Sequence, residues 1–472
     1  MNMFRRFVFL FAALGALLCS CGGRHAAQAV ADAGEPAFLD IFERPQGGWT
    51  VVSVSPFDGS KDSLVVDRPL RRLIVMSTSH YGFLDALGRT DLIVGASGVD
   101  YLFTDQSVTE NGYRRQSLAV RTPRSARPLP SLGESVKTSL PSLSVDLGPS
   151  LLHDEGVHGP DLPDLPPDSN PVVAASLDGE TTATLGTLRG GTGAERSGAS
   201  GGAERSEAVE PPELAATAGI VDVGYDGAAD YERIMELEPD VVLTYAVSGA
   251  KSPFVSKLEQ LGIKVFTVNE HLERHPLARA SYIRLFGALS GEMAAADSIL
   301  SSVKESYNAL ASSVSGSGGK VRKVLLNIPY NDQWFVPSTE SYLTALIHDA
   351  GGEVLGCETG KAASSVMSVE KAYTLSEEAD CWLNTGWCNS KKDLLEVNTI
   401  FTDMLGNIER NAKEAGIKGP VVWNDNNRVN PKGGNDIWQS GVARPDLVLR
   451  DLVGILHPTD PIGETIYYKS ID

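Results

Sequence analysis

The chain has 472 residues, of which 42% are hydrophobic, and a formal net charge of -19 at pH 7. This length allows two domains with substantial cores, and the acidic balance argues against nucleic acid, which requires a basic binding surface. After the N-terminus, no apolar run approaches the length of a membrane-spanning helix.

The N-terminus has the pattern of a secretion signal. A positively charged start precedes an apolar run over 7–18, which is too short to span a bilayer. The run ends in Leu-Cys-Ser-Cys-Gly-Gly, which resembles a bacterial lipobox and predicts a signal peptide over 1–20 with acylation of Cys21. The alternative is a plain secretory signal with incidental cysteines. Acylation would tether the chain to a cell-envelope membrane through residues 21–48.

Three cysteines would remain in the mature chain, Cys357, Cys381 and Cys388. An odd number in an oxidising compartment allows one disulfide and requires none. Zinc binding by Cys381 and Cys388 is a weaker alternative, because the sequence has no second closely spaced cysteine pair.

Short apolar runs alternate with amphipathic stretches over 49–105 and 217–275, which predicts a first α/β lobe. The intervening segment, 106–216, is rich in Pro, Ser and Gly and has no sustained helical or strand period. It is therefore predicted to be a long, mostly disordered insertion, and no role is assigned to it. The strands expected in this lobe are 73–76, 92–96, 220–223, 241–244 and 265–268.

Apolar residues recur at helical spacing over 276–314, which predicts one long helix, with Ser290 as a plausible cap before Glu292. A second lobe is expected over 320–472, with strands at 323–327, 381–384 and 421–423. The predicted fold is α/β, with two Rossmann-like lobes joined by a long helix.

Three consecutive motifs resemble a known family: Val-Gly-Tyr-Asp at 223–226, Tyr-Glu-Arg-Ile at 231–234 and Glu-Pro-Asp-Val-Val-Leu at 238–243. They are similar to the solute-binding proteins of ABC importers for iron-siderophores, haem and cobalamin. The resemblance covers nearly all of the chain outside the signal and the insertion, which departs from the family pattern. It implies a periplasmic, lipid-anchored protein that is not an enzyme and needs no cofactor. Such a protein captures an iron chelate or cobalamin between its lobes and delivers it to a permease.

The resemblance also implies permease-docking residues, because one surface glutamate per lobe meets arginines of the permease in this family. The matching positions are Glu232 and Glu370, each near the start of an expected helix, where the helix dipole favours a carboxylate. Without the resemblance, both would be interpreted as ordinary solvated acids.

Ligand contacts are expected in loops that follow strands, where α/β folds bind ligands. Aromatic side chains there offer flat apolar surface, although aromatic residues more often belong to a core. Arg428 lies in the polar loop 424–428 and could pair with a carboxylate or phosphate, unless it forms a salt bridge with a nearby acid. The predicted ligand-binding residues are His80, Tyr81, Tyr101 and Tyr245 in the first lobe, and Trp334, Trp387, Arg428 and Trp438 in the second.

Three other functions remain open. A receptor for bare Zn²⁺ or Mn²⁺ could use His80, His271 and His275, but Pro276 disfavours helical backbone at His275. A chelatase-like enzyme would share the two-lobe fold, yet the sequence has no metalloprotease, phosphate-binding or nucleophile-elbow motif. A structural or adhesive lipoprotein would depend on the insertion. For the transport function, a modest hinge closure about the long helix is expected.

Overall fold

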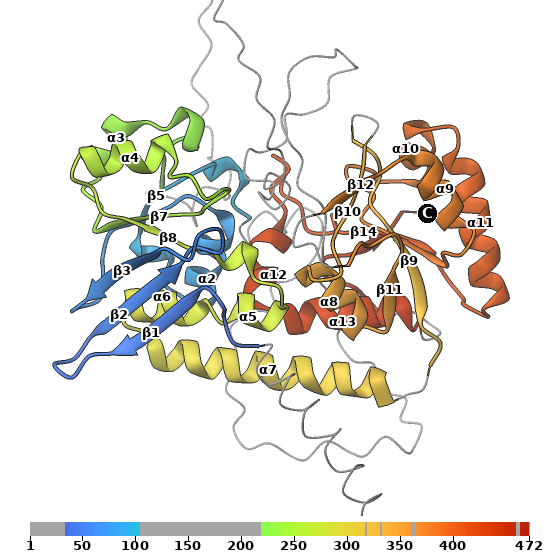
Figure 1. Cartoon of the computed structure of the whole chain (residues 1–472), viewed down its shortest axis with the longest axis horizontal. Helices are drawn as coiled ribbons and strands as arrows, with labels where there is room; N and C mark the ends of the chain where they lie inside the picture. Colours follow the sequence, from blue (N-terminus) through green and yellow to red (C-terminus); the bar gives the residue numbers. More distant parts are fainter. Residues whose placement is uncertain are drawn as a thin grey trace, which may run out of the picture.

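The computed structural model describes residues 34–103, 219–316, 319–330, 333–359, 364–458 and 463–471. Two α/β lobes lie side by side, and a long helix runs along one side of both (Figure 1). The predicted α/β class with two lobes and a connecting helix is confirmed. The predicted signal peptide, Cys21 and the insertion over 106–216 lie outside the described residues.

The first lobe is built on a five-stranded parallel sheet of order β6-β5-β4-β7-β8. The central strands β4 and β7 are buried along their whole length, as expected for apolar strands covered on both sides. The five strands predicted for this lobe are confirmed. They are β4 (Leu73–Val75), β5 (Ile93–Ala96), β6 (Val221–Asp222), β7 (Val241–Thr244) and β8 (Val265–Thr267), and the helices α2 (Thr78–Ala86), α3 (Tyr231–Glu236) and α4 (Pro253–Gln260) follow β4, β6 and β7.

An antiparallel sheet that was not predicted precedes the first lobe. Its strands, in spatial order, are β1 (Leu39–Glu43), β2 (Trp49–Val54) and β3 (Lys61–Val66). The Glu273 carboxylate accepts hydrogen bonds from the backbone N–H groups of Ala37 and Phe38 at 3.1 and 3.0 Å, which fixes the chain entering β1. The tether predicted over 21–48 is therefore wrong for its last part, because residues from Leu39 onward belong to the fold.

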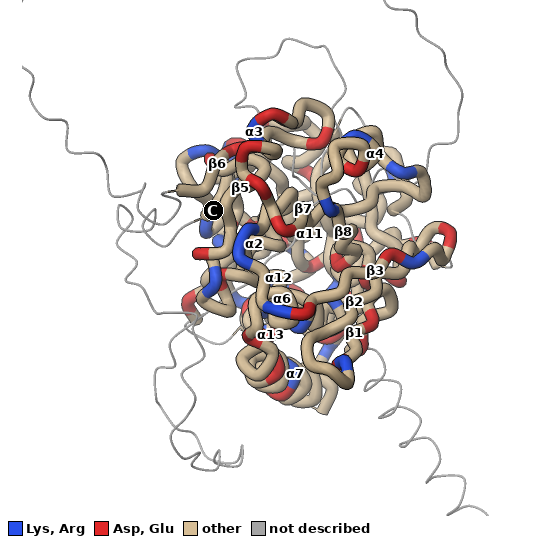
Figure 2. The backbone as a smooth tube through the Cα atoms, turned by 90° about the vertical axis from the view of Figure 1, so that its left-hand side faces the viewer, with Lys and Arg blue, Asp and Glu red and all other residues tan. Residues whose placement is uncertain are grey.

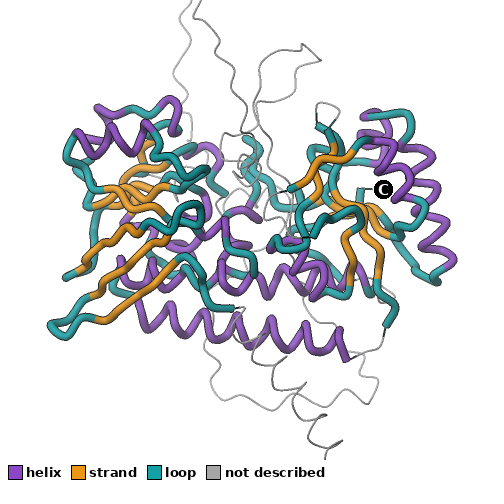
Figure 3. The backbone as a smooth tube through the Cα atoms, in the orientation of Figure 1, coloured by secondary structure: helices purple, strands orange, loops and turns teal. Residues whose placement is uncertain are grey.

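The second lobe repeats the parallel arrangement in a sheet of order β11-β9-β13-β14-β15, in which only β15 is antiparallel. The three strands predicted here are confirmed as β9, β13 and β14. Figure 3 shows the strands of the two lobes as separate groups with helices around them. The strands are β9 (Arg322–Leu326), β11 (Gly352–Val354), β13 (Cys381–Leu383), β14 (Val422–Asn424) and β15 (Lys469–Ser470), with a separate pair β10 (Trp334–Val336) and β12 (Ser365–Met367). The helices are α8 (Tyr342–Asp349), α9 (Val369–Ser376), α10 (Lys391–Val397), α11 (Phe401–Glu414), α12 (Ser440–Ala443) and α13 (Pro445–Leu456).

The connection between the lobes is three helices, not the single helix predicted over 276–314. They are α5 (Pro276–Ala280), α6 (Ile283–Ser290) and α7 (Met293–Gly316). Gly291 ends α6 in the left-handed conformation with φ of 82°, and the Ser290 hydroxyl donates back to the Phe286 carbonyl at 2.7 Å. Ser290 therefore closes α6 and does not cap the helix that follows. No helix in the described ranges is both long enough and apolar enough to span a membrane.

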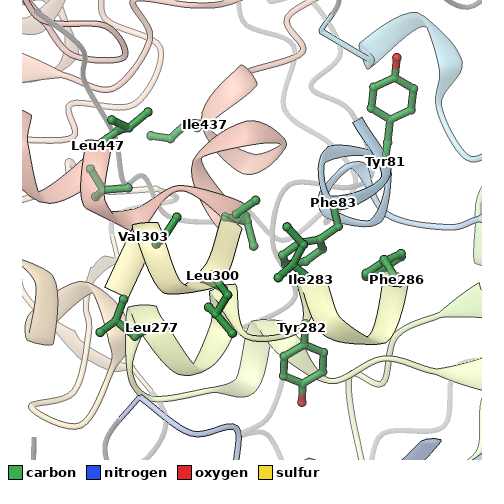
Figure 4. Packing of buried hydrophobic residues seen from close by; sticks show 14 of the residues in the cluster. Tyr81, Phe83, Leu277, Tyr282, Ile283, Phe286, Leu300, Val303, Ile437 and Leu447 are labelled. Atoms are coloured by element: carbon green, nitrogen blue, oxygen red, sulfur yellow. The ribbon is translucent and has the colours of Figure 1, made fainter. Parts of the chain in front are cut away.

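The two lobes share one hydrophobic core. A single cluster of buried side chains includes Val75 and Leu243 of the first sheet and Val324 and Leu383 of the second. The connecting helices supply much of it, as Figure 4 shows for side chains of α5, α6 and α7 beside Leu447 of α13. An interface of this kind resists separation of the lobes, because opening it would expose apolar surface to water.

Candidate functional site

A small cavity lies where the connecting helices meet the second lobe. Its walls come from α5, α8, α12, α13 and the 3-10 turn Asp436–Trp438 (η8), and the half-buried Trp438 is part of them. The Arg279 guanidinium of α5 lies 4.9 Å from the centre of the Tyr342 ring of α8, so a cation–π contact links the connection to the second lobe. The lining residues include Arg279, Tyr342, Leu346, Ile437, Trp438 and Val442.

The carboxyl end of β8 leads into a buried polar cluster centred on Glu270, in the 3-10 turn Glu270–Leu272 (η7). The Ser79 hydroxyl donates to its Oε1 at 2.6 Å. His80 Nε2 and His271 Nδ1 each lie 3.8 Å from its Oε2, and Arg279 Nη2 lies 4.0 Å from Oε1. Glu270 Oε2 and both ring nitrogens of His80 have no hydrogen-bond partner among the described residues. The cluster joins α2, η7 and α5.

Burial on its own would raise the pKa of Glu270. The imidazoles of His271 and His80 outweigh that effect and hold the pKa of Glu270 well below its usual value. Glu270 is therefore a buried carboxylate, stabilised by its neighbours. Sequence reasoning missed it, although an acid two residues after a predicted strand and next to a histidine was the available signal.

The histidines considered as metal ligands do not come together as one set. His80 and His271 flank Glu270, but His275 caps α5, where its Nδ1 accepts from the Leu277 N–H at 3.1 Å. Arg279 already places a positive charge beside Glu270, which disfavours a second cation. Across the described ranges, no group of three or more His, Cys, Asp or Glu could hold a metal ion.

The three cysteines predicted for the mature chain are unpaired. Burial raises the pKa of Cys381 and of Cys388 to about 12, which keeps both as neutral thiols. The structure therefore shows neither a disulfide nor a thiolate pair suited to zinc at these two positions.

The predicted tyrosines all lie in segments that follow strands of the first sheet, one on a helix and two on a turn or loop. Tyr81 is buried on α2, and Figure 4 shows its ring directed away from Phe83. Tyr101 is half-buried in the 3-10 turn Val99–Tyr101 (η2), after β5. Tyr245 is half-buried after β7, with its ring 5.9 Å from that of His271 in an edge-on arrangement. Tyr101 and Tyr245 thus keep partly accessible side chains, whereas Tyr81 does not.

The structure corrects the predicted contact of Trp334 and shows that Arg428 is paired with an acid. Trp334 is fully buried, its ring is stacked 6.0 Å from that of Trp382, and its N–H donates to the Leu326 carbonyl at 2.6 Å. It belongs to the core of the lobe, where no ligand reaches it. Arg428 Nε donates to Asp436 at 2.7 Å, and its guanidinium lies 4.7 Å from the centre of the Phe103 ring. Arg428 therefore has the structural role that the salt-bridge alternative predicted.

Trp387 has the exposure that a ligand platform needs, because 44% of it is accessible. It lies in the loop 386–389 after β13. The Asn424 amide holds this loop by donating to the carbonyls of Gly386 and Cys388 at 2.7 and 2.8 Å. An aromatic side chain on a loop fixed by hydrogen bonds can contact a flat ligand with little loss of conformational entropy.

A second connection between the lobes is made by hydrogen bonds from two amide side chains. The Gln439 amide accepts from the Phe103 N–H at 2.9 Å and donates to the Phe103 carbonyl at 2.6 Å. The Asn430 amide donates to the carbonyls of Asp100 and Leu102 at 3.0 and 3.1 Å. We call this set of contacts between backbone 100–103 and the side chains of Asn430 and Gln439 the interlobe clasp.

Two glycines allow the backbones to approach closely near the clasp. A side chain at Gly434 would collide with the Tyr101 carbonyl, and one at Gly82 would collide with the Gln439 carbonyl. Sequence reasoning missed the clasp, because nothing in a sequence tells which backbone carbonyl an amide side chain will reach.

The two predicted docking glutamates are exposed at helix starts, one in each lobe. Glu232 follows the N-cap Asp230 of α3, and Glu370 follows the N-cap Ser368 of α9. Hydrogen bonding by the Ser368 hydroxyl lowers the pKa of Glu370, so this carboxylate stays charged. Figure 1 places α3 and α9 in the upper half of the same view, on opposite lobes. Figure 2 shows acidic residues on α3 at the outer end of the first lobe.

A protein-family model matches part of the chain. The family model described as periplasmic binding protein matches residues 175–404, a range that contains the motifs at 223–243. This match confirms the resemblance predicted from those motifs. An uncharacterised lipoprotein of Methanocaldococcus jannaschii is 26% identical over 246 residues, which are 51% of this chain and 53% of the relative. The chain thus spans about half the length of that relative.

The chain is also similar, at low sequence identity, to solved structures of other proteins. A periplasmic binding protein from Veillonella parvula is 13% identical, with 87% of this chain and 99% of that chain covered at a TM-score of 0.48. A periplasmic heme binding protein from Pseudomonas aeruginosa is 12% identical, with coverages of 85% and 98% and a TM-score of 0.44. Neither similarity assigns a ligand to this chain.

Proposed function

Because residues 175–404 match the periplasmic binding protein family, we propose that this chain is the substrate-binding component of an ABC importer. It would capture an iron chelate, such as a ferric siderophore or haem, or cobalamin, and deliver it to a permease. The observation that supports this most is the pair of mainly parallel sheets joined by the connecting helices, with partly accessible aromatic residues after their strands. Loops at the carboxyl ends of parallel strands are where such folds bind ligands.

Binding would be tested by tryptophan fluorescence of the protein from Gly22 onward, titrated with haem, a ferric siderophore, cobalamin, Zn²⁺ and Mn²⁺. Saturable quenching by one chelate is expected, with a smaller amplitude in Trp387→Phe, because Trp387 is the exposed tryptophan of the second lobe. Trp49→Phe, in β2 of the first lobe, is the matched control and should keep the quenching.

Two results would count against chelate binding. A response only to Zn²⁺ or Mn²⁺ that disappears in His80→Ala would support the metal receptor, since His80 lies beside Glu270. A wild-type protein that responds to none of the five probes would contradict the transport proposal.

Docking would involve Glu232 and Glu370, which offer exposed carboxylates on separate lobes. We expect Glu232→Gln and Glu370→Gln to lower ligand uptake in cells about tenfold each while ligand affinity in solution stays unchanged, because an arginine–carboxylate contact contributes on the order of 1.5–3 kcal/mol. Glu236→Gln, exposed on the same helix as Glu232, is the matched control and should keep normal uptake. If all three variants take up ligand as fast as wild type, these glutamates do not belong to the docking surface.

Anchoring through Cys21 would place the protein on a periplasmic membrane surface. Labelling of cells with a radioactive fatty acid should mark the wild-type protein, and Cys21→Ala should lose the label and pass into the soluble fraction. A labelled Cys21→Ala protein would contradict the anchor.

A further inference from the structure

Lys469 lies at the carboxyl edge of the second sheet, and the described part of the chain gives it no acidic partner. It stands in β15 directly opposite Asn424, the last residue of β14. Its ammonium donates to the neutral amide oxygen of Asn389 at 2.9 Å, and no carboxylate among the described residues lies within 4 Å of it. An ammonium has three donors, so this single neutral acceptor leaves its charge uncompensated.

Burial lowers the pKa of Lys469, and the more distant charge of Asp393 opposes the change. Asp393 is itself committed to the start of α10, where it accepts from the backbone N–H groups of Asn389 and Ser390 at 2.8 and 2.9 Å. The ammonium is therefore half-desolvated, and the nearest acid is occupied. A cation in this position gains from an anionic partner more than an exposed lysine would, because less water screens the interaction.

The surroundings of Lys469 are fixed by amide side chains. Asn426 donates to the same Asn389 oxygen at 3.1 Å, and Asn389 donates to the Trp387 carbonyl at 3.1 Å. Because Asn424 holds the same loop, the charge of Lys469 and the exposed ring of Trp387 belong to one rigid unit. Arg428, the cation expected from the sequence, is instead occupied by Asp436.

We propose that Lys469 binds a carboxylate of the ligand while Trp387 contacts the flat apolar part of the same ligand. The proposal rests on the transport function and makes it more specific. It favours chelates with free carboxylates, such as haem, over chelates whose ring side chains are neutral amides, such as cobalamin. The aromatic ring can contact the planar, apolar part of such a ligand, and the fixed cation can bind the carboxylate at its edge.

The test compares Lys469→Met and Lys469→Arg with wild type, using haem and haem dimethyl ester as probes. Methionine keeps the length of the side chain and removes the charge, so haem affinity should fall about 10- to 100-fold, as expected for loss of one hydrogen bond to a charged group. Arginine should restore most of that loss. The ester should bind wild type and Lys469→Met equally, because it has no carboxylate to lose. Lys413→Met, at an exposed position of α11, is the control and should leave both affinities unchanged.

Each other outcome is decisive. If haem binds Lys469→Met as tightly as wild type, Lys469 is not a ligand contact, and the transport function still stands. If wild type binds only cobalamin with an affinity that Lys469→Met does not change, the carboxylate preference is wrong. If a ferric siderophore is the ligand, the same variants are titrated with it. An unchanged siderophore affinity in Lys469→Met would again show that Lys469 is not a ligand contact. If wild type binds no chelate, the transport function fails and this inference fails with it. The melting temperature of each variant identifies any loss caused by unfolding.

Discussion

Glu270 is the residue on which the polar interior of the first lobe depends. Four polar side chains surround its carboxylate, three of them within 3.8 Å, and the residue is almost completely buried. A buried charge is tolerated only when neighbouring dipoles and charges compensate for lost hydration. Removing the charge would leave Arg279 and the two histidines without the group that organises them.

We expect Glu270→Gln to lower the free energy of unfolding at pH 7 by about 3 kcal/mol, the size typical of breaking a buried charge pair. Because the pKa of Glu270 is lowered in the folded state, its stabilisation is present above the unfolded pKa and is lost as the pH falls through the folded value. Wild type should therefore lose more stability than the variant when the pH is lowered from about 5 toward 2.

Urea unfolding at a series of pH values measures both effects. Glu259→Gln is the control, because Glu259 pairs with Lys251 at an exposed site, where a salt bridge contributes at most about 1 kcal/mol. Equal stability of Glu270→Gln and wild type at pH 7 would show that the carboxylate is not needed.

At the residue scale, the sequence located only part of the candidate site. Trp387 follows a predicted strand and is exposed, as a ligand contact requires, whereas Trp334 starts a strand that turns its ring toward Trp382 in the core. The sequence shows that an aromatic residue lies near a strand end but not which way its ring points. The same limit applies to the two cations of the second lobe. Only the folded structure shows that Arg428 pairs with Asp436, whereas Lys469 contacts a neutral amide oxygen.

Among the structural elements, the connecting helices show that apolar residues can keep helical spacing across the end of one helix and the start of the next. Apolar residues continue at helical spacing through α6 and α7, which is why one helix was predicted. Gly291 interrupts it, because a left-handed residue cannot continue a right-handed helix. A side chain on Gly291 would also approach the ring of Pro69 to 2.7 Å.

Gly291→Ala is expected to lower the free energy of unfolding by about 1–2 kcal/mol, the cost of a left-handed conformation for a residue with a side chain. Gly406→Ala gives the opposite expectation, because Gly406 lies inside α11 with open space around it. Alanine there should stabilise the protein by about 0.5–1 kcal/mol. Thermal and urea unfolding of both variants measure the difference, and a neutral Gly291→Ala would show that α6 and α7 can join without strain.

The antiparallel sheet β1–β3 was missed because its alternation of buried and exposed residues is incomplete. Phe42 and Val65 are exposed by 55% and 48%, so apolar side chains occupy both sides of the strands. Without clear alternation, a sequence gives little sign of which residues face the core. The central parallel strands β4, β7 and β13 are buried along their whole length, and their short apolar runs make them recognisable.

For the whole molecule, the interlobe clasp and the shared core together determine how far the lobes can separate. The clasp joins backbone 100–103 to Asn430 and Gln439, and the core continues through the connecting helices. Two connections between the lobes leave less freedom for hinge motion than one would. This agrees with the modest closure expected from the sequence, which remains a prediction.

We expect the double variant Asn430→Ala with Gln439→Ala to broaden the distribution of distances between spin labels placed on α3 and α9, measured by pulsed electron resonance. Its free energy of unfolding should fall by about 2–4 kcal/mol, because backbone groups that both amides satisfied stay buried. Asn411→Ala is the control: it removes three amide hydrogen bonds inside the second lobe, so stability should fall while the distance distribution stays unchanged. An unchanged distribution in the double variant would show that the shared core alone sets the geometry.

The shared core also has a consequence for amide hydrogen exchange. When two lobes are continuous, exchange that requires global unfolding proceeds at one common rate in the sheets of both. A ligand that contacts only the second lobe would raise the free energy of that global opening for the whole chain. Slow amides in β4 and β7 of the first lobe should then become slower when ligand is added, although no ligand atom touches them. Deuterium uptake in the first lobe would thus report the strength of ligand binding to the second lobe.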